Sequence, residues 1–265
     1  MNTKRYKNLI RGGRDLRATQ DVLSIWKKFD DFPMETITKA WYSQLTSGYK
    51  QRTVEQMKSH REQYGTSGNC FDLAIWLIDE FRQEKFHSYA ILTPESHVAV
   101  VALNDKGNRY LCDLGDQWIE PILIEQNHDN YTEEFLDNFF PGAKVKLESS
   151  ENSLFVTYKR PNGKVSKQRY ILNPISDERL IAEGEKTQRT LWTPLVERRI
   201  FTDSQVIHWE FDNYISFFSS IDGKQMESKL QTMEEWVERI SNASGINKKI
   251  VRDALIVYSK KSPEN

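Results

Sequence analysis

Residues 65–78 read Gly65-Thr66-Ser67-Gly68-Asn69-Cys70-Phe71-Asp72-Leu73-Ala74-Ile75-Trp76-Leu77-Ile78. In this stretch a glycine-containing turn runs directly into an apolar segment, with a cysteine at the junction. Apolar residues recur at helical spacing, which predicts a largely buried helix over residues 70–86. A helix N-terminus presents unpaired backbone N–H groups and a partial positive charge, and both favour a thiolate. The pattern therefore indicates a reactive thiol at Cys70, although an inert buried cysteine would fit the same position.

The overall composition excludes several classes of partner. The chain has 265 residues, with 37 Lys and Arg against 38 Asp and Glu. This balance creates no global field that would attract nucleic acid or an anionic membrane. No apolar run approaches the length of a membrane span, and no apolar leader follows the basic residues 1–7. We therefore expect a globular cytoplasmic protein without nucleic-acid or membrane partners, and the sequence leaves its oligomeric state open.

The two cysteines, Cys70 and Cys112, form neither a Cys-x-x-Cys pair nor a Cys/His cluster, so we expect no metal site. One disulfide between them is compatible with the sequence, but a reducing cytoplasm favours two free thiols. Strand alternation turns Cys112 away from its neighbour Asp113, which predicts a small core residue.

Helical patterns lie at the two ends of the chain. The first two are expected at residues 21–26 and 33–41, the latter with Pro33 near its first turn. Two closing helices are expected at residues 228–241 and 247–258, separated by Gly245.

Strand patterns occupy the middle of the chain. The expected strands cover residues 87–93, 97–103, 109–114, 154–160 and 167–172. Turn residues 104–108 and 161–164 join two pairs of them into hairpins. Such hairpins favour a small antiparallel sheet or barrel over a parallel α/β sheet. Residues 176–189 are polar and give no clear pattern.

A thiol nucleophile needs a base within hydrogen-bond reach, and the base needs a third group that orients it. His97 opens one strand, and Asp113 lies near the end of the next strand along the chain. Taken alone, His97 fits a structural histidine and Asp113 fits a turn or cap residue. Their order after Cys70 favours a joint catalytic role.

The register of the first hairpin decides whether the two side chains can meet. If Leu103 pairs with Arg109, His97 lies opposite Gly115, and Asp113 becomes its diagonal neighbour about 7–8 Å away between backbones. A register shifted by one residue would place the two side chains on opposite faces.

The other four histidines have weaker claims to act as the base. His87 begins a strand and is the strongest alternative. His208 lies beside Trp209 and fits either packing or the lining of a substrate channel. His60 lies in a highly charged segment that suggests solvated surface, and His128 lies in a polar loop.

These residues carry a resemblance to the arylamine N-acetyltransferase family, within the wider group of transglutaminase-like and papain-like Cys-His-Asp enzymes. Residues 67–72 parallel the family's Gly-Gly-x-Cys-Phe-Glu element, and residues 97–100 parallel its histidine strand. Residues 110–115 parallel its Tyr-Leu-Val-Asp-Val-Gly strand, and residues 32–37 are similar to its Pro-Phe-Glu-Asn element. The resemblance covers roughly the first 170 residues.

The resemblance implies an α+β, cysteine-proteinase-like fold in three parts. A helical bundle carrying the cysteine is expected at residues 1–86, a β-barrel carrying the histidine and aspartate at residues 87–200, and an α/β or helical lid at residues 201–265.

The resemblance also implies a reaction. Acetyl-CoA, or another acyl-CoA, acylates the cysteine, and an arylamine, hydrazine or other small amine then takes the acyl group. Cys70 becomes the nucleophile, His97 the base and Asp113 its orienter, and the backbone N–H of Cys70 contributes to the oxyanion hole. The alternatives are a transglutaminase-like, amide synthase-like or peptidase-like thiol enzyme, and a noncatalytic binding protein that retains the fold.

The sequence departs from the family near the site. Thr66 and Asn69 replace arginines that usually flank the glycine pair, and residues 116–117 are Asp-Gln in place of Phe-Gly. Both changes affect the surroundings of the acyl group.

No phosphate-binding loop is evident in residues 176–207, so the residues that would bind CoA are unknown. Basic residues that could meet a CoA phosphate, or form only a solvated face, are Lys186, Arg189, Arg198 and Arg199. Aromatic residues that could line the pocket, or pack only in the core, are Phe71, Trp118 and Trp209.

Overall fold

The computed structural model describes residues 16–46 and 49–260, so residues 1–7 lie outside the described part. The helices are α1 (Gln20–Trp26), the 3₁₀ helix η2 (Lys27–Phe29), α2 (Ile37–Tyr42), α3 (Val54–Tyr64), α4 (Cys70–Gln83), α5 (Asp177–Arg189), α6 (Met233–Ser244) and α7 (Lys248–Ser259). The strands are β1 (Met34–Glu35), β2 (Ser88–Leu92), β3 (Val98–Leu103), β4 (Arg109–Cys112), β5 (Ile122–Leu123), β6 (Leu136–Phe140), β7 (Ala143–Ser149), β8 (Ser153–Lys159), β9 (Val165–Ile175), β10 (Leu195–Phe201), β11 (Val206–Asp212), β12 (Ile215–Ser220) and β13 (Gly223–Met226).

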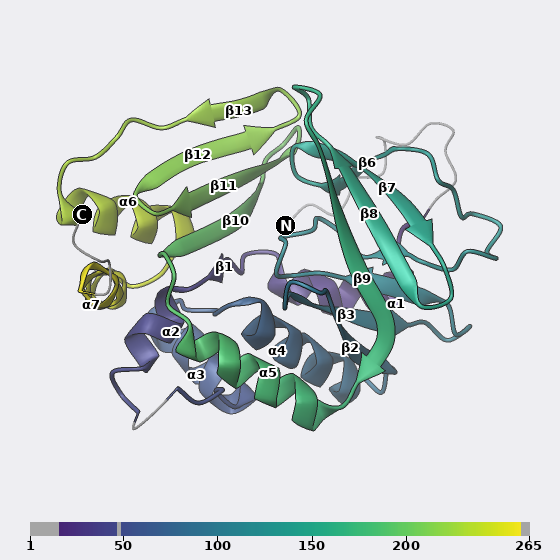
Figure 1. Ribbon diagram of the computed structural model, residues 1–265, viewed down its shortest axis with the longest axis horizontal. Coiled ribbons are helices and arrows are strands. Elements are labelled where there is room, and N and C mark those ends of the chain that lie inside the picture. Colours follow the sequence, from purple (N-terminus) through teal and green to yellow (C-terminus); the bar gives the residue numbers. More distant parts are fainter. Residues whose placement is uncertain (1–15, 47–48, 261–265) are drawn as a thin grey trace.

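Two antiparallel sheets face each other, with helices below them and at one side (Figure 1). The larger sheet has eight strands in the order β5-β4-β3-β2-β9-β8-β7-β6 and is nearly closed into a barrel. The smaller sheet has five strands in the order β1-β10-β11-β12-β13. The expected α+β architecture with a central antiparallel barrel is therefore confirmed.

Both predicted hairpins are present in the larger sheet. Leu103 pairs with Arg109 at the turn between β3 and β4, which is the register on which the His97–Asp113 hypothesis depends. Lys159 pairs with Val165 at the turn between β8 and β9.

The helix α4 begins at Cys70 because Asn69 caps it. The Asn69 side-chain oxygen accepts hydrogen bonds from the backbone N–H groups of Phe71 (3.0 Å) and Asp72 (3.2 Å). In return, the Asp72 carboxylate accepts one from the Asn69 N–H at 3.1 Å, which completes a capping box. The helix ends at Gln83, three residues before the predicted end.

Two hydrophobic clusters stabilise the fold. The first joins α1 and α4 to the eight-stranded sheet. The second joins the small sheet to α6 and α7, and it includes Ile37, Ala40 and Trp41 from α2. The early helix α2 thus packs with the C-terminal part of the chain. Strand β10 spans the expected boundary at residue 200, and the three-part division stays a prediction.

The predicted helix at residues 33–41 is wrong over its first part. Met34 pairs with Glu197 and Glu35 with Val196, so these residues form strand β1 at the edge of the small sheet. The backbone N–H of Glu35 also donates to the Gly68 carbonyl at 2.8 Å. These long-range bonds outweigh the local helical signal, and α2 begins only at Ile37.

The closing helices are confirmed with shifted starts. The helix α6 begins after the Thr232 capping box, five residues later than predicted, and buries Trp236, Val237 and Ile240. Gly245 ends it with a φ of 79°, a backbone conformation that favours glycine. None of the helices in the described ranges combines the length and apolar character that crossing a bilayer requires.

Candidate active site

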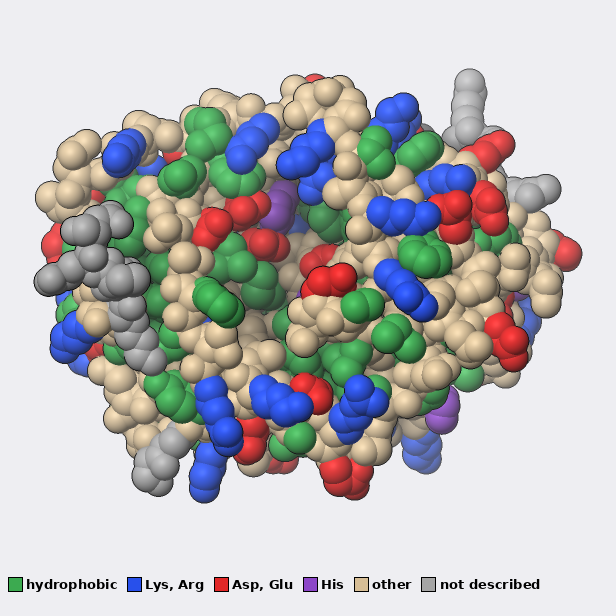
Figure 2. Space-filling view, in the orientation of Figure 1, with side chains coloured by type: hydrophobic (Ala, Val, Ile, Leu, Met, Phe, Trp, Pro, Cys, Tyr) green, Lys and Arg blue, Asp and Glu red, His purple; other side chains and the backbone are tan. Residues whose placement is uncertain are grey.

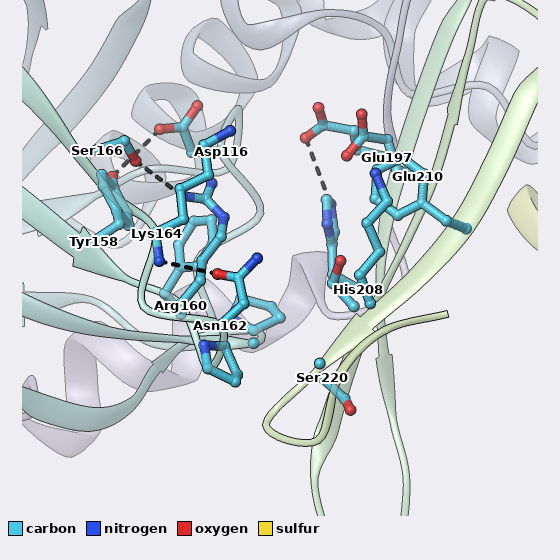
Figure 3. A pocket seen from close by; sticks show the side chains of 18 of the residues that line it. Asp116, Tyr158, Arg160, Asn162, Lys164, Ser166, Glu197, His208, Glu210 and Ser220 are labelled. Carbon is cyan, nitrogen blue, oxygen red and sulfur yellow. Dashed lines mark hydrogen bonds and ion pairs between the residues drawn. The ribbon is translucent and has the colours of Figure 1, made fainter. Parts of the chain in front are cut away.

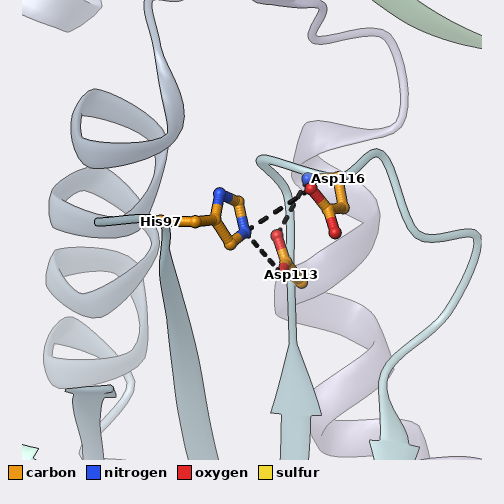
Figure 4. A group of neighbouring side chains, drawn as sticks. All are labelled: His97, Asp113 and Asp116. Atoms are coloured by element: carbon orange, nitrogen blue, oxygen red, sulfur yellow. Dashed lines mark hydrogen bonds and ion pairs between the residues drawn. The ribbon is translucent and has the colours of Figure 1, made fainter. Parts of the chain in front are cut away.

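His97 and Asp113 meet at the end of the β3–β4 hairpin (Figure 4). The last pair in the ladder is Val100 with Cys112, and beyond it the two side chains turn toward each other. The Nε2 atom of His97 lies 2.8 Å from Oδ2 of Asp113. Asp113 is fully buried, whereas 18% of the His97 side chain is exposed. The structure therefore brings together the predicted base and its orienter.

Cys70 lies beside the same histidine, and Gly115 makes their approach possible. A Cβ atom on Gly115 would lie 2.6 Å from Cβ of Cys70 and 2.6 Å from Cε1 of His97. The Cys70 side chain is partly exposed, and its interaction with the His97 ring helps to raise the pKa of that ring. All three predicted site residues are thus neighbours, although they come from α4, the start of β3 and the end of β4.

Asp113 is held by two further donors. The hydroxyl of Tyr170 on β9 donates to Oδ2 of Asp113 at 2.8 Å, and the backbone N–H of Asp116 donates to Oδ1 at 2.9 Å. Tyr170 was not recognisable as a site residue from the sequence, because it is one aromatic residue in an alternating strand. These bonds orient the carboxylate that in turn orients His97.

Electrostatics favour a protonated His97. Burial lowers the pKa of His97, but the charges of Asp113 and Asp116 and the hydrogen bonds to Asp113 and Cys70 outweigh it and raise the pKa well above its usual value. These contacts therefore stabilise the imidazolium that forms when the ring takes a proton.

A second cation, Lys39, interacts electrostatically with Cys70. The Lys39 ammonium donates to the carbonyls of Thr190 (2.6 Å) and Thr187 (3.3 Å) near the end of α5. Burial lowers the pKa of Lys39, and interaction with Cys70, Asp72 and Glu35 partly opposes this. Lys39 was not recognised in the sequence because it lies far from the motif along the chain.

The loop before Cys70 is held by the buried carboxylate of Glu35. This group accepts hydrogen bonds from the backbone N–H groups of Ser67 (3.1 Å), Gly68 (2.6 Å) and Thr38 (2.7 Å), and from the Thr38 hydroxyl. Glu35 thereby ties the small sheet to the turn that presents the cysteine. It lies within the Phe32–Ile37 element that the resemblance identified.

We expect Glu35→Ala to lower the free energy of unfolding by about 3–5 kcal/mol, because it leaves three buried N–H groups without their acceptor. Urea denaturation monitored by circular dichroism measures this change. Glu62→Ala, at an exposed position on α3, is the matched control and should change stability by less than about 0.5 kcal/mol. Equal stability of the two variants would contradict the role given to Glu35.

The Asp116-Gln117 departure from the family changes the surroundings of His97. Oδ1 of Asp116 lies 3.6 Å from Nε2 of His97. Burial raises the pKa of Asp116 to about 7, against the lowering effect of His97.

Gln117 has a φ of 56°, in the region that favours glycine. Its side chain compensates by accepting from the Arg199 N–H (3.1 Å) and donating to the Leu114 carbonyl (2.8 Å).

Two of the histidines considered as alternatives to His97 do not lie where the catalytic base is expected. His87 is exposed and lies beside Leu103, at the end of β3 remote from His97. His128 accepts a hydrogen bond from the Asn130 N–H within its own loop.

His60, predicted to be solvated, is half-buried. Its ring packs 5.2 Å from that of Trp41 and 6.1 Å from that of Tyr64, and burial lowers its pKa. The charged residues around it on α3 concealed this partial burial.

Arg199 cannot meet a CoA phosphate. Its guanidinium is buried, donates to the carbonyls of Trp118 and Phe29, and lies over the Trp26 ring. Arg198 donates to the Ala243 carbonyl at 2.7 Å.

On α5, Lys186 is exposed and pairs with Glu183, and Arg189 is exposed as well. The three candidate lining residues are core residues with 1% exposure or less; these are Phe71, Trp118 and Trp209.

Cys70 and Cys112 are both free thiols. Cys112 is buried, as predicted, and burial raises the pKa of its thiol far above the usual value. The two cysteines therefore differ strongly in accessibility.

In the described ranges, His97, Asp113 and Asp116 could also offer metal ligands, since their donor atoms lie within 4.8 Å of one another. However, Asp113 already accepts hydrogen bonds from Tyr170 and Asp116. This geometry is that of an oriented histidine, and the expected absence of a metal stays a prediction.

A cavity of about 530 Å³ lies between the two sheets and reaches Asp116. Figure 2 shows a hollow in this face, with basic side chains along its edge and acidic side chains and a histidine within it. Side chains of the barrel, including Asp116 and Tyr158, face Glu197, His208 and Glu210 of the small sheet (Figure 3). His208, whose role the sequence left open, lines this cavity.

No protein-family model and no curated protein sequence matches this chain significantly. Solved structures, however, match over nearly its whole length. Arylamine N-acetyltransferase from Mycobacterium tuberculosis has a TM-score of 0.70 and 13% identity, over 95% of each chain. The Mycobacterium marinum enzyme in complex with CoA has a TM-score of 0.70 and 12% identity, over 94% of this chain and 95% of that one. The Salmonella typhimurium enzyme has a TM-score of 0.68 and 10% identity, over 92% and 90%.

Sequence identity of 10–13% establishes a shared architecture. The structural match covers nearly the whole chain and so extends beyond the first 170 residues, which carry the sequence resemblance. The protein therefore has the fold of the arylamine N-acetyltransferases.

Proposed function

We propose that this protein is an acyltransferase that moves an acetyl group from acetyl-CoA, through a thioester on Cys70, to a small amine. The observation that carries the proposal is the position of the His97 ring, which lies 2.8 Å from Asp113 and, across Gly115, beside Cys70 at the start of a capped helix. The shared fold supports it, and one structure with that fold contains CoA.

The first half-reaction follows from the contacts of His97. Its Nε2 is bound to Asp113, which leaves Nδ1 to take the proton of the Cys70 thiol. The thiolate attacks the acetyl carbonyl, a C–S bond to Cys70 forms, and the C–S bond to CoA breaks. The CoA sulfur leaves with a proton supplied by His97.

Charge that develops on the acetyl oxygen would meet the N-terminus of α4. Asn69 caps the N–H groups of Phe71 and Asp72, so the N–H of Cys70 is the one directed to the oxyanion. The electrostatic interaction of the Lys39 ammonium with Cys70 would add to this stabilisation.

Intact-protein mass spectrometry after incubation with acetyl-CoA tests the proposal. We expect one acetyl adduct, located by peptide mapping on Cys70, that is absent in Cys70→Ala and retained in Cys112→Ala. Iodoacetamide at neutral pH should alkylate Cys70 much faster than Cys112, because Cys112 is buried and its pKa is raised.

An adduct that persists in Cys70→Ala contradicts the proposal. Peptide hydrolysis or transamidation without any requirement for CoA would instead support the peptidase-like or transglutaminase-like alternative. A panel of arylamines and hydrazines, added to the acetylated protein, then identifies acceptors by loss of the adduct.

A further inference from the structure

The ring of His97 faces two carboxylates with the same nitrogen (Figure 4). Oδ2 of Asp113 lies 2.8 Å from Nε2, and Oδ1 of Asp116 lies 3.6 Å from it. A ring nitrogen carries at most one proton, and the contact with Asp113 uses it. The longer distance is outside the range of a hydrogen bond, so Asp116 acts on the ring through its charge. The two carboxylates therefore have different tasks, and only Asp113 orients the ring directly.

The barrel holds Asp116 in this position. Its backbone N–H donates to Oδ1 of Asp113 at 2.9 Å. Its Oδ2 lies 3.5 Å from the hydroxyl of Tyr158 on β8. Tyr158 is only 5% exposed, and its hydroxyl donates to Oε1 of Gln168 on β9 at 3.0 Å. The second carboxylate is therefore fixed beside His97 by contacts with the end of β4 and with the barrel wall.

The charge of Asp116 acts on His97 together with that of Asp113. Burial lowers the pKa of His97, and the charges of Asp113 and Asp116 more than offset this effect. The other titratable groups that face the ring or Asp116 come from α4, β8, β9, β10 and β11; these are Cys70, Tyr158, Tyr170, Glu197 and His208.

The second half of the proposed reaction places a new positive charge on His97. In the acetylated protein the sulfur of Cys70 is a neutral thioester. The amine nitrogen attacks the acetyl carbonyl, a C–N bond forms, and the proton lost by nitrogen passes to Nδ1 of His97. The C–S bond then breaks, and its electron pair returns to sulfur as a thiolate. Until that bond breaks, no thiolate balances the imidazolium.

The first half of the reaction makes a smaller demand on the carboxylates. There the proton of the Cys70 thiol passes to His97, and the thiolate that remains balances the imidazolium from the start. The ring becomes neutral again when it gives this proton to the CoA sulfur. Additional negative charge beside the ring should therefore favour the second half-reaction more than the first.

We propose that Asp116 is a second counter-ion of His97, a positioning residue that promotes transfer of the acetyl group from Cys70 to the acceptor. The inference rests on the proposed acyltransferase function. Asp116 takes the place of a phenylalanine in the pattern of the family that the sequence resembles. The second charge is thus a departure of this chain from that pattern.

Asp116→Asn tests the proposal, because it removes the charge and keeps the shape of the side chain. We expect the protein acetylated on Cys70 to lose its acetyl group to 4-methylaniline, and to water, at least about tenfold more slowly than the wild type. This is the scale of one pKa unit at the His97 ring. Acetylation of Cys70 by acetyl-CoA should stay within about threefold of the wild-type rate.

Rapid quench and intact-protein mass spectrometry measure both rates, the second after removal of CoA. Hydrolysis by water decides the question if 4-methylaniline does not react. Asp105→Asn is the matched control, since it removes an exposed carboxylate from the turn at the other end of the same hairpin. It should keep both rates.

A purely structural role for Asp116 predicts a different pattern. It would slow the two half-reactions equally and lower the urea midpoint of Asp116→Asn. We expect the midpoint not to fall, because the variant removes repulsion between two neighbouring carboxylates. A wild-type transfer rate in Asp116→Asn, or equal losses in both half-reactions, would overturn the inference.

Failure of the proposed function gives a separate result. If no acetylated protein forms, NMR titration of the His97 ring still tests the second counter-ion. We expect the pKa of the ring to fall in Asp116→Asn and to stay unchanged in Asp105→Asn. An unchanged pKa in Asp116→Asn would show that Asp116 is not a counter-ion of His97.

Discussion

Gly115→Ala is expected to slow acetylation of Cys70 by about 10²-fold or more while the protein remains folded. The added methyl group would lie 2.6 Å from Cβ of Cys70 and 2.6 Å from Cε1 of His97. The first is the root of a side chain fixed on α4, so neither group can make room by rotating a flexible end. The nucleophile and its base must therefore move apart.

The rate of adduct formation from acetyl-CoA, followed by rapid quench and mass spectrometry, measures this loss. Gly184→Ala is the matched control, because its methyl group would meet the movable end of the Gln51 side chain. That variant should keep its rate, and alanine suits its position within α5. A wild-type rate in Gly115→Ala would mean that Cys70 and His97 do not react as a pair.

The core of the candidate site was predictable because its signals are local. Asn69 and Asp72 mark a capped helix start, which places Cys70. The turn between Leu103 and Arg109 has a typical hairpin composition, and its register alone brings His97 toward Asp113. Each of these inferences needs only residues that are close together in the sequence.

The small sheet was not predictable by the same means. Its strands β10 to β13 mix charged and apolar residues, and they are stabilised by packing against α6, α7 and the distant α2. The helix α5 escaped notice because it buries only Leu180, Gly184 and Gln188. In both cases tertiary contacts determine the structure, and a single sequence does not display them.

The sequence predictions also failed for charged side chains that the structure buries. Arg199 looked like a surface cation, yet it lies within the core, where burial lowers its pKa to about 10. Its partners are backbone carbonyls of Trp118 and Phe29, which no side-chain pattern reveals. Glu35 satisfies backbone N–H groups in the same way, and only the family resemblance directed attention to it.

Asp113→Asn is expected to reduce acetylation of Cys70 by about 10³–10⁴-fold, the scale known for the equivalent change in serine protease triads. The carboxylate accepts from His97, Tyr170 and the Asp116 N–H, and an amide cannot accept from all three. The variant also loses the charge that contributes most to raising the pKa of His97. We therefore expect the His97 pKa to fall, so that the ring is neutral over a wider range of pH.

Single-turnover acetylation and NMR titration of the His97 ring measure the two effects. Tyr170→Phe is the matched control, since it removes one hydrogen bond to Asp113 and keeps the charge. We expect it to lose no more than about tenfold in rate. If the acetylation rate of Asp113→Asn also falls by no more than about tenfold, Asp113 does not orient the base. Asp116, whose carboxylate lies 3.6 Å from the same ring nitrogen, would then be the residue to replace, and Asp116→Asn should show the large loss.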